Sequence, residues 1–118
     1  MSKHDTVYLD HILDAINQIE FYTDGLSYET FSEDRLIQDG VVRQLEIIGE
    51  ACRALSPDFR AQHPDPPWKQ IMGLRNRLIH AYFDINLGII WDIVQADIPR
   101  LKAQVRSLAD LYGATGTQ

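Results

Sequence analysis

Apolar side chains recur every three or four residues along most of the chain, which is the spacing of one face of an α-helix. The first stripe predicts a helix from about Asp5 to Thr23. Asp5 can cap the start of this helix, and Gly25 marks its end. The apolar positions of the stripe are Leu9, Ile12, Leu13, Ile16 and Ile19.

A second helical pattern opens at Ser27 and continues to Ser56-Pro57. Asp34 lies within it and suits a helix cap, so we expect one helix that is bent or split near Ser32–Asp34. Gly49 interrupts the apolar face, and a glycine inside a helix costs about 1 kcal/mol relative to alanine. Close approach by another helix would explain this glycine. The pattern consists of Phe31, Leu36, Ile37, Val41, Leu45, Ile48 and Leu55.

The second half of the chain begins with a proline-rich stretch. Four prolines within residues 56–67 predict a loop and exclude a long regular element. A helix should then begin near Trp68 and carry the sequence KQIMGLRNRLIHAYF, with a break near Asp84–Asn86. A last helical region is expected from about Leu87 to Leu111, where Pro99 either starts a new first turn or kinks the helix.

No segment has the sustained alternation of a β-strand, so the sequence predicts an all-α bundle of four or five helices. A chain of 118 residues suits one domain, expected over residues 1–112, with a disordered tail at 113–118. No apolar run approaches the roughly 20 residues that span a bilayer, and no signal peptide is evident. A single cysteine, Cys52, points to a reducing cytoplasm and is either a buried packing residue or a functional thiol.

The net charge of −6 argues against a general nucleic-acid binder. The charge is unevenly distributed, however. Residues 35–80 hold seven basic residues against five acidic ones, a net of +2, whereas residues 1–34 have a net of −7 and residues 81–118 a net of −1. The middle of the chain could therefore contain a local phosphate-binding site, or its charges could belong to an ordinary solvated helix surface.

The segment Arg75-Asn76-Arg77-Leu78-Ile79-His80-Ala81-Tyr82 concentrates four polar functions on about two helical turns. Asn76 and His80 are four residues apart and share a helix face. Cleavage of RNA needs such groups, because the 2′-OH must lose a proton, the 5′ oxygen must gain one, and charge on the phosphate must be stabilised. Histidine can be acid or base, and arginine binds phosphate through two parallel hydrogen bonds. No metal or other cofactor is needed for this chemistry.

The spacing alone has a structural alternative, in which Arg75 and Arg77 are solvated while His80 and Tyr82 are half-buried. One histidine does not easily act as acid and base at once, so a two-fold homodimer that joins two His80 side chains would favour catalysis. Among the other polar groups, His63 is expected to be exposed in the loop. Glu50 is expected either to form an ion pair with an arginine across the bundle or to belong to the active site.

The string from Arg75 to Tyr82 resembles the Arg-x4-His-x-Tyr motif of the HepT toxins, which belong to the HEPN superfamily. Further similarity is found in Tyr28-Glu29-Thr30-Phe31, Leu45-Glu46-Ile47-Ile48-Gly49-Glu50-Ala51, Pro67-Trp68-Lys69-Gln70-Ile71 and Trp91-Asp92-Ile93-Val94. The resemblance extends over roughly residues 5–111 and implies a HEPN-type bundle of four to five helices.

The resemblance also implies a function. HepT proteins are metal-independent ribonuclease toxins that form homodimers with the two motifs in one cleft. Their antitoxin, the small nucleotidyltransferase MntA, transfers AMP onto the motif tyrosine, which corresponds to Tyr82 here. The implied catalytic residues are Arg75, Asn76 and His80, and Arg77 and Lys69 are candidate contacts to RNA phosphate.

Two hypotheses follow. The first is an RNA-cleaving cytoplasmic toxin that AMP addition neutralises. The second is a non-catalytic helical partner that binds a nucleotide or positions a substrate for a minimal nucleotidyltransferase.

Overall fold

The computed structural model describes residues 3–74, 76–78 and 86–112. The predictions that concern Arg75, His80, Tyr82 and the tail at 113–118 therefore lie outside the described residues. The regular elements that the structure describes are all helical, which confirms the all-α class. Within these ranges, no helix is long and apolar enough to cross a membrane.

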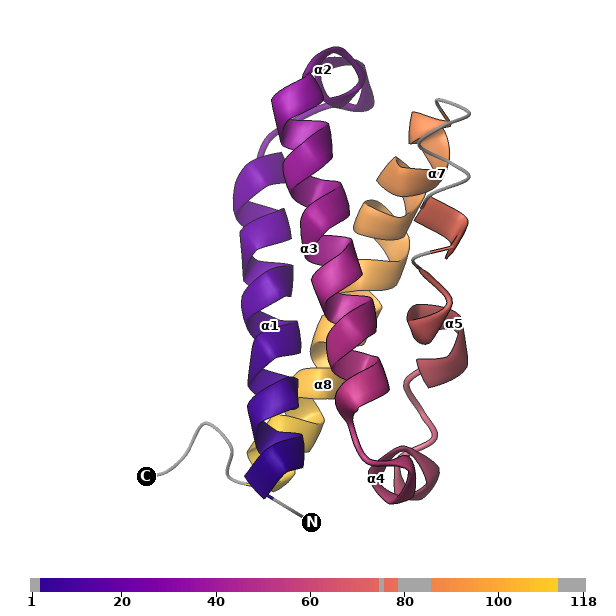
Figure 1. The fold of residues 1–118 in the computed structure, drawn as a ribbon. Helices are drawn as coiled ribbons and strands as arrows, with labels where there is room; N and C mark the ends of the chain where they lie inside the picture. Colours follow the sequence, from indigo (N-terminus) through magenta and orange to yellow (C-terminus); the bar gives the residue numbers. More distant parts are fainter. Residues whose placement is uncertain (1–2, 75, 79–85, 113–118) are drawn as a thin grey trace.

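Two long helices form one side of the molecule. Helix α1 (Lys3–Thr23) and helix α3 (Arg35–Ala54) lie side by side over most of their lengths, with α8 (Ile98–Leu111) packed behind them (Figure 1). The stripe predicted for α1 is buried, and Gly25, at φ 72°, lies in the turn that follows this helix, as expected. Leu36 is an exception to the second stripe, because 83% of its surface is exposed.

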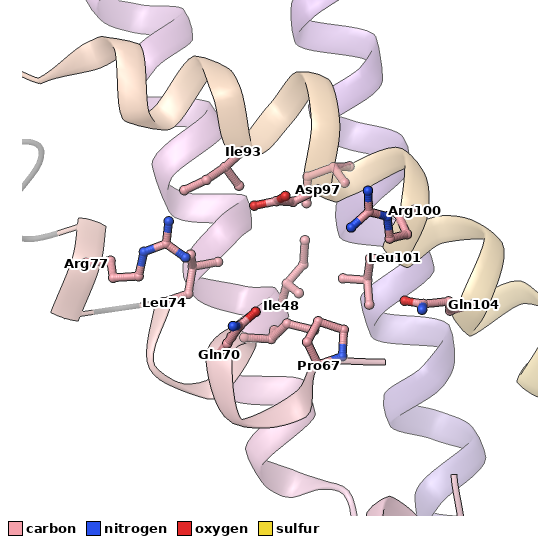
Figure 2. Close-up of a pocket in the computed structure, with 12 residues that line it drawn as sticks. Ile48, Pro67, Gln70, Leu74, Arg77, Ile93, Asp97, Arg100, Leu101 and Gln104 are labelled. Atoms are coloured by element: carbon pink, nitrogen blue, oxygen red, sulfur yellow. The ribbon is translucent and has the colours of Figure 1, made fainter. Parts of the chain in front are cut away.

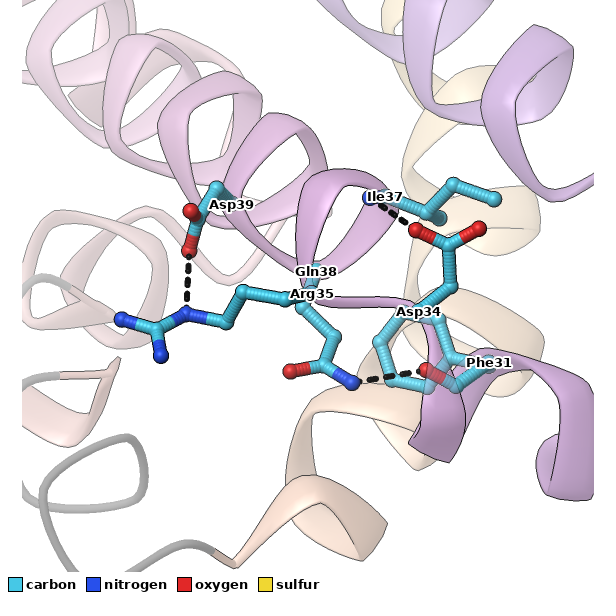
Figure 3. Close-up of polar contacts among 6 residues, drawn as sticks. All are labelled: Phe31, Asp34, Arg35, Ile37, Gln38 and Asp39. Carbon is cyan, nitrogen blue, oxygen red and sulfur yellow. Dashed lines mark hydrogen bonds and ion pairs between the residues drawn. The ribbon is translucent and has the colours of Figure 1, made fainter.

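The predicted split near Asp34 is confirmed. A short helix, α2 (Tyr28–Glu33), precedes α3, and the Ser27 hydroxyl accepts a hydrogen bond from the Thr30 N–H at 3.1 Å. The Asp34 carboxylate accepts from the Ile37 N–H at 3.1 Å and so caps α3 (Figure 3). At the same junction, the buried Gln38 amide donates to the Phe31 carbonyl at 2.8 Å (Figure 3).

The proline-rich stretch was predicted to be a loop, and that prediction was partly wrong. Helix α4 (Pro57–Gln62) forms within it. Pro57 does not prevent this helix, because it occupies the first turn, where its missing N–H has no consequence. The Ser56 hydroxyl caps this helix by accepting from the Phe59 N–H at 3.2 Å.

Asp5 does not cap α1, which already includes Lys3. Its side chain is 2% exposed, and its carboxylate accepts hydrogen bonds from the Ser56 N–H at 2.8 Å and from the Ser56 hydroxyl at 2.9 Å. Asp5 therefore holds the start of α4 against α1, a role that depends on residues about fifty positions apart in the sequence.

Helix α5 (Trp68–Met72) begins where the sequence predicted but ends sooner. The Gly73 N–H donates to the Lys69 carbonyl at 3.1 Å, and a turn at Gly73 separates α5 from the helical residues Leu74 and 76–78. The single helix expected from Trp68 onward is thus divided at Gly73.

The last helical region also follows the prediction closely. Helix α7 (Leu87–Asp92) is capped by the Asn86 side chain, which accepts from the Ile89 N–H at 3.4 Å. A π-helical turn, η1 (Ile93–Asp97), joins α7 to α8, and Pro99 lies in the first turn of α8. Because proline has no N–H and its ring crowds the carbonyl four residues earlier, a wider turn accommodates it.

Candidate active site

The predicted site residues that the structure describes lie on the surface. Asn76 and Arg77 are exposed on helical backbone, and Lys69 is exposed on α5. Leu74 and Leu78 are buried at 5% and 2% exposure. These leucines are four residues apart and share one face, so they anchor the segment and direct Asn76 and Arg77 toward solvent.

The helix that leads into this segment is held by contacts to its backbone. A Cβ atom placed on Gly49 would lie 3.1 Å from the Ile71 carbonyl oxygen, so the predicted close approach of another helix at Gly49 is confirmed. The next residue of α5, Met72, is held as well. Its carbonyl accepts a hydrogen bond from the Arg53 guanidinium at 3.2 Å, and its sulfur contacts the Arg60 guanidinium. Helix α5 is therefore fixed to α3 just before the motif segment begins.

His63 was expected to be exposed, and this expectation was wrong. Its ring is half-buried, lies 4.7 Å from the Phe59 ring between centroids, and is hydrogen-bonded to the Tyr112 hydroxyl. Its carbonyl accepts from the Trp68 indole N–H at 2.7 Å. His63 therefore ties the α4–α5 connection to the end of α8, which is a structural role.

Glu50 pairs with Arg43 at 3.7 Å, but both residues are on α3, so the expected pair across the bundle was wrong. Both side chains are more than half exposed, at 63% for Glu50 and 62% for Arg43, and such a pair contributes little because water and salt screen it.

Cys52 is fully buried, which confirms the packing interpretation. Burial raises the pKa of its thiol to about 12, and the nearby Arg60 charge opposes this shift only in part. Since the thiolate is the nucleophilic form, this cysteine is unreactive at neutral pH.

A cavity of about 90 Å³ lies beside Arg77, between α3, α5, η1 and α8 (Figure 2). Its apolar lining includes Ile48, Ile71, Leu74, Ile93 and Leu101, and its polar lining consists of Gln70, Arg77, Asp97, Arg100 and Gln104. Sequence reasoning identified Arg77 but missed the other polar residues. In the sequence, Pro99 could have indicated where some of the lining residues lie, because the π-turn next to it carries Ile93 and Asp97.

The all-α bundle and the motif segment Arg75-x4-His80 place the protein in the HEPN class of helical proteins. The profile of the family described as "Ribonuclease HepT-like" matches residues 12–108. The chain therefore belongs to the HepT-like family, and the resemblance noted from its motifs is confirmed.

Curated relatives agree with this assignment. The chain is 43% identical over 106 residues to "Putative RNase MJ1380" of Methanocaldococcus jannaschii. These residues are 89% of this chain and 97% of the relative. It is 40% identical over 108 residues to "Probable ribonuclease HepT" of Thermococcus cleftensis, covering 92% and 98% of the two chains. No solved structure matches the chain.

Proposed function

We propose that this protein is a metal-independent endoribonuclease whose catalytic residues are Arg75, Asn76 and His80. The observation that carries the proposal is that the HepT-like match over residues 12–108 includes the whole segment from Arg75 to Tyr82. The two relatives from Methanocaldococcus jannaschii and Thermococcus cleftensis are named as ribonucleases and support the same activity.

The proposed reaction is an internal transesterification. The 2′ oxygen of the RNA attacks the adjacent phosphorus, so a bond from the 2′ oxygen to phosphorus forms and the bond from phosphorus to the 5′ oxygen breaks. His80 exchanges the protons, Arg75 stabilises the negative charge on the phosphate, and Asn76 orients the reacting groups. The products are a 2′,3′-cyclic phosphate and a 5′-hydroxyl, and no metal or other cofactor takes part.

A homodimer would complete this site, because one His80 could accept the proton from the 2′-OH while the second protonated the leaving oxygen. We place the domain at residues 1–112 with a tail at 113–118, and we place its action in the cytoplasm. The exposed side chains of Arg77 and Lys69 would contact phosphates on either side of the cleaved bond.

The proposed biological role is that of a toxin in a toxin–antitoxin pair. An MntA-type nucleotidyltransferase would neutralise it by transferring AMP from ATP to the Tyr82 hydroxyl with release of pyrophosphate. The added phosphate would repel the RNA backbone, and the added nucleoside would occupy the cleft beside His80.

The experiment is cleavage of a mixed RNA pool in EDTA by the wild type, His80→Ala and His11→Ala, with intact mass spectrometry of each sample. His11 is exposed on α1 and provides a matched control. We expect cleavage by the wild type and His11→Ala, with 2′,3′-cyclic phosphate ends, and none by His80→Ala. Cleavage retained by pure His80→Ala contradicts the assignment.

Absence of cleavage by unmodified, folded wild type would reject the ribonuclease and favour the non-catalytic nucleotide-binding partner. A wild-type sample that carries adenylate would be repeated after expression without any nucleotidyltransferase. In that repeat, cleavage supports the proposal and its absence rejects it.

A further inference from the structure

The cavity beside Arg77 has a lining that suits a nucleobase. Its apolar residues come from four elements, namely α3, α5, η1 and α8, together with Leu74 of the motif segment. Such a lining can accept the flat face of an aromatic ring, while the polar residues around it can read the ring's edge. Because Arg77 lines it, this cavity lies next to the segment that we propose to be catalytic.

Two cations flank the apolar lining. Arg77 and Arg100 are both exposed, and neither has an ion-pair partner among the residues that the structure describes. Figure 2 shows them on different sides of the cavity, Arg77 next to Leu74 and Arg100 next to Leu101. Guanidinium groups in this position can bind the phosphates on both sides of a base that enters between them.

One hydrogen-bond acceptor in the lining of the cavity has no partner among the described residues. The Gln104 amide nitrogen donates to the Asp65 carbonyl at 3.2 Å, which leaves its oxygen, Oε1, as the unused group. This oxygen is buried and accepts no hydrogen bond from any described residue. Buried polar atoms without partners are rare and costly, so a donor that entered the cavity would be bound favourably.

Asp97 adds a second acceptor. Figure 2 shows its carboxylate on the side of the cavity formed by η1 and α8, near Ile93. A carboxylate and an amide oxygen select a base edge that presents N–H groups, and they disfavour an edge made of carbonyl oxygens. An exocyclic amino group meets this requirement.

The volume favours a small ring. A cavity of roughly 150 Å³ holds benzene, so a space of about 90 Å³ admits only one edge of a six-membered ring, and a single ring leaves less of its apolar surface outside the cavity than a fused pair does. Cytosine is the RNA base that combines one six-membered ring with an exocyclic amino group.

We propose that this cavity binds a cytosine of the RNA next to the cleaved bond, with the amino group toward Gln104 and Asp97 and the flanking phosphates on Arg77 and Arg100. The proposal rests on the proposed ribonuclease function for the identity of its ligand. We call this cavity the cytosine slot, and binding there would make cleavage depend on the RNA sequence.

The test is binding of uncleavable RNA to the full chain. Trinucleotides with 2′-O-methyl groups, CpCpC, UpUpU and ApApA, are titrated into ¹⁵N-labelled protein and followed by NMR. We expect CpCpC to bind at least about fivefold more tightly than the other two, which is the lower end of discrimination by base-edge contacts. Equal affinities for the three would overturn the proposal.

Variants assign the preference to residues. Gln104→Leu should bring the affinity for CpCpC down to that for UpUpU, whereas Gln95→Leu, an exposed glutamine on η1, should leave the preference unchanged. Arg100→Ala should weaken all three ligands and reduce the slope of log affinity against log salt by about 0.7, the value for one phosphate contact on a single strand. Arg106→Ala, exposed on the same helix outside the cavity, should change neither quantity. A preference that survives in Gln104→Leu contradicts the slot.

Cleavage in EDTA separates this proposal from the proposed function. If cleavage depends on His80 but shows the same base frequencies in the wild type and Gln104→Leu, the ribonuclease stands and the cytosine slot is rejected. If unmodified wild type cleaves no RNA but still prefers CpCpC through Gln104, the slot stands and the ribonuclease is rejected.

Discussion

The two sides of this bundle are built differently. On one side, α1 and α3 have 21 and 20 residues, and side chains such as Leu9, Ile16, Leu45 and Ile48 are fully buried between them and their neighbours. On the other side, α5 has five residues and α7 has six, and a π-turn follows α7 (Figure 1). A cavity of about 90 Å³ remains where α5 and the π-turn face α3 and α8.

This difference separates stability from chemistry. Long helices with continuous apolar faces provide most of the burial that stabilises a small domain. Short helices and an irregular turn bury less, but they leave polar groups such as Arg77 and Asp97 at the surface beside a cavity. The two sides are joined where Gly49 and Arg53 of α3 contact Ile71 and Met72 of α5, directly before the motif segment begins.

The largest expected effect compares one buried leucine from each side. Leu45→Ala should lower the free energy of unfolding by about 3 kcal/mol, because the fully buried side chain leaves a cavity. Leu74 already lines an open cavity, so Leu74→Ala should cost about 1 kcal/mol less than Leu45→Ala. Urea unfolding at several protein concentrations measures both, since any dimer would make the apparent stability depend on concentration. Equal losses would contradict the comparison.

The next effect concerns the residue that connects α1 to the start of α4. Asp5→Ala removes the acceptor of two hydrogen bonds from Ser56 and should lower the free energy of unfolding by about 2 kcal/mol. Asp14→Ala, an exposed acidic residue of the same helix, should change it by less than about 0.5 kcal/mol. Thermal unfolding of the two variants is the measurement, and a similar change in both would show that the buried contact is unimportant.

Two glycines of α3 provide a sharper comparison between the sides. A Cβ at Gly49 would lie 3.1 Å from the Ile71 backbone carbonyl, and a Cβ at Gly40 would lie 3.1 Å from the ring of Tyr22. The backbone of α5 cannot move without shifting the motif, whereas a half-buried ring can turn aside. Gly49→Ala should therefore destabilise by about 1 kcal/mol, since crowding outweighs the gain in helix propensity.

Gly40→Ala should instead be neutral or stabilising by up to about 1 kcal/mol. If Gly40→Ala destabilises as much as Gly49→Ala, the contact with α5 has no special importance. RNA cleavage by Gly49→Ala adds a second readout. A displaced α5 should lower the rate of cleavage even though most of the protein remains folded at the assay temperature.

The smallest effect at neutral pH concerns Cys52. Its pKa is raised from the ordinary value to about 12, so burial of the protonated thiol stabilises the fold fully below about pH 9, and that stabilisation is lost as the pH rises toward 12. At pH 8, alkylation of the folded protein followed by mass spectrometry should show no modification, whereas urea-unfolded protein should react completely. Cys52→Val should keep the neutral-pH stability and reduce the loss above pH 9. Rapid labelling of the folded protein would contradict this account.

The sequence by itself determined the features that depend on neighbouring residues. Apolar spacing located the buried faces of α1 and α3, and Asp34 marked the start of α3 because a cap acts on an N–H only two or three residues away. The motif segment and the family were evident for the same reason, since the relevant residue types are adjacent in the chain.

Tertiary structure alone decided the features that depend on distant residues. Packing placed Asp5 against Ser56, gave Gly49 its contact with Ile71, and brought His63 to Tyr112. It also brought Arg77, Arg100 and Gln104 to the lining of one cavity. Local propensities do not specify which helix faces meet, because the distance and angle between helices follow from how all their side chains pack together.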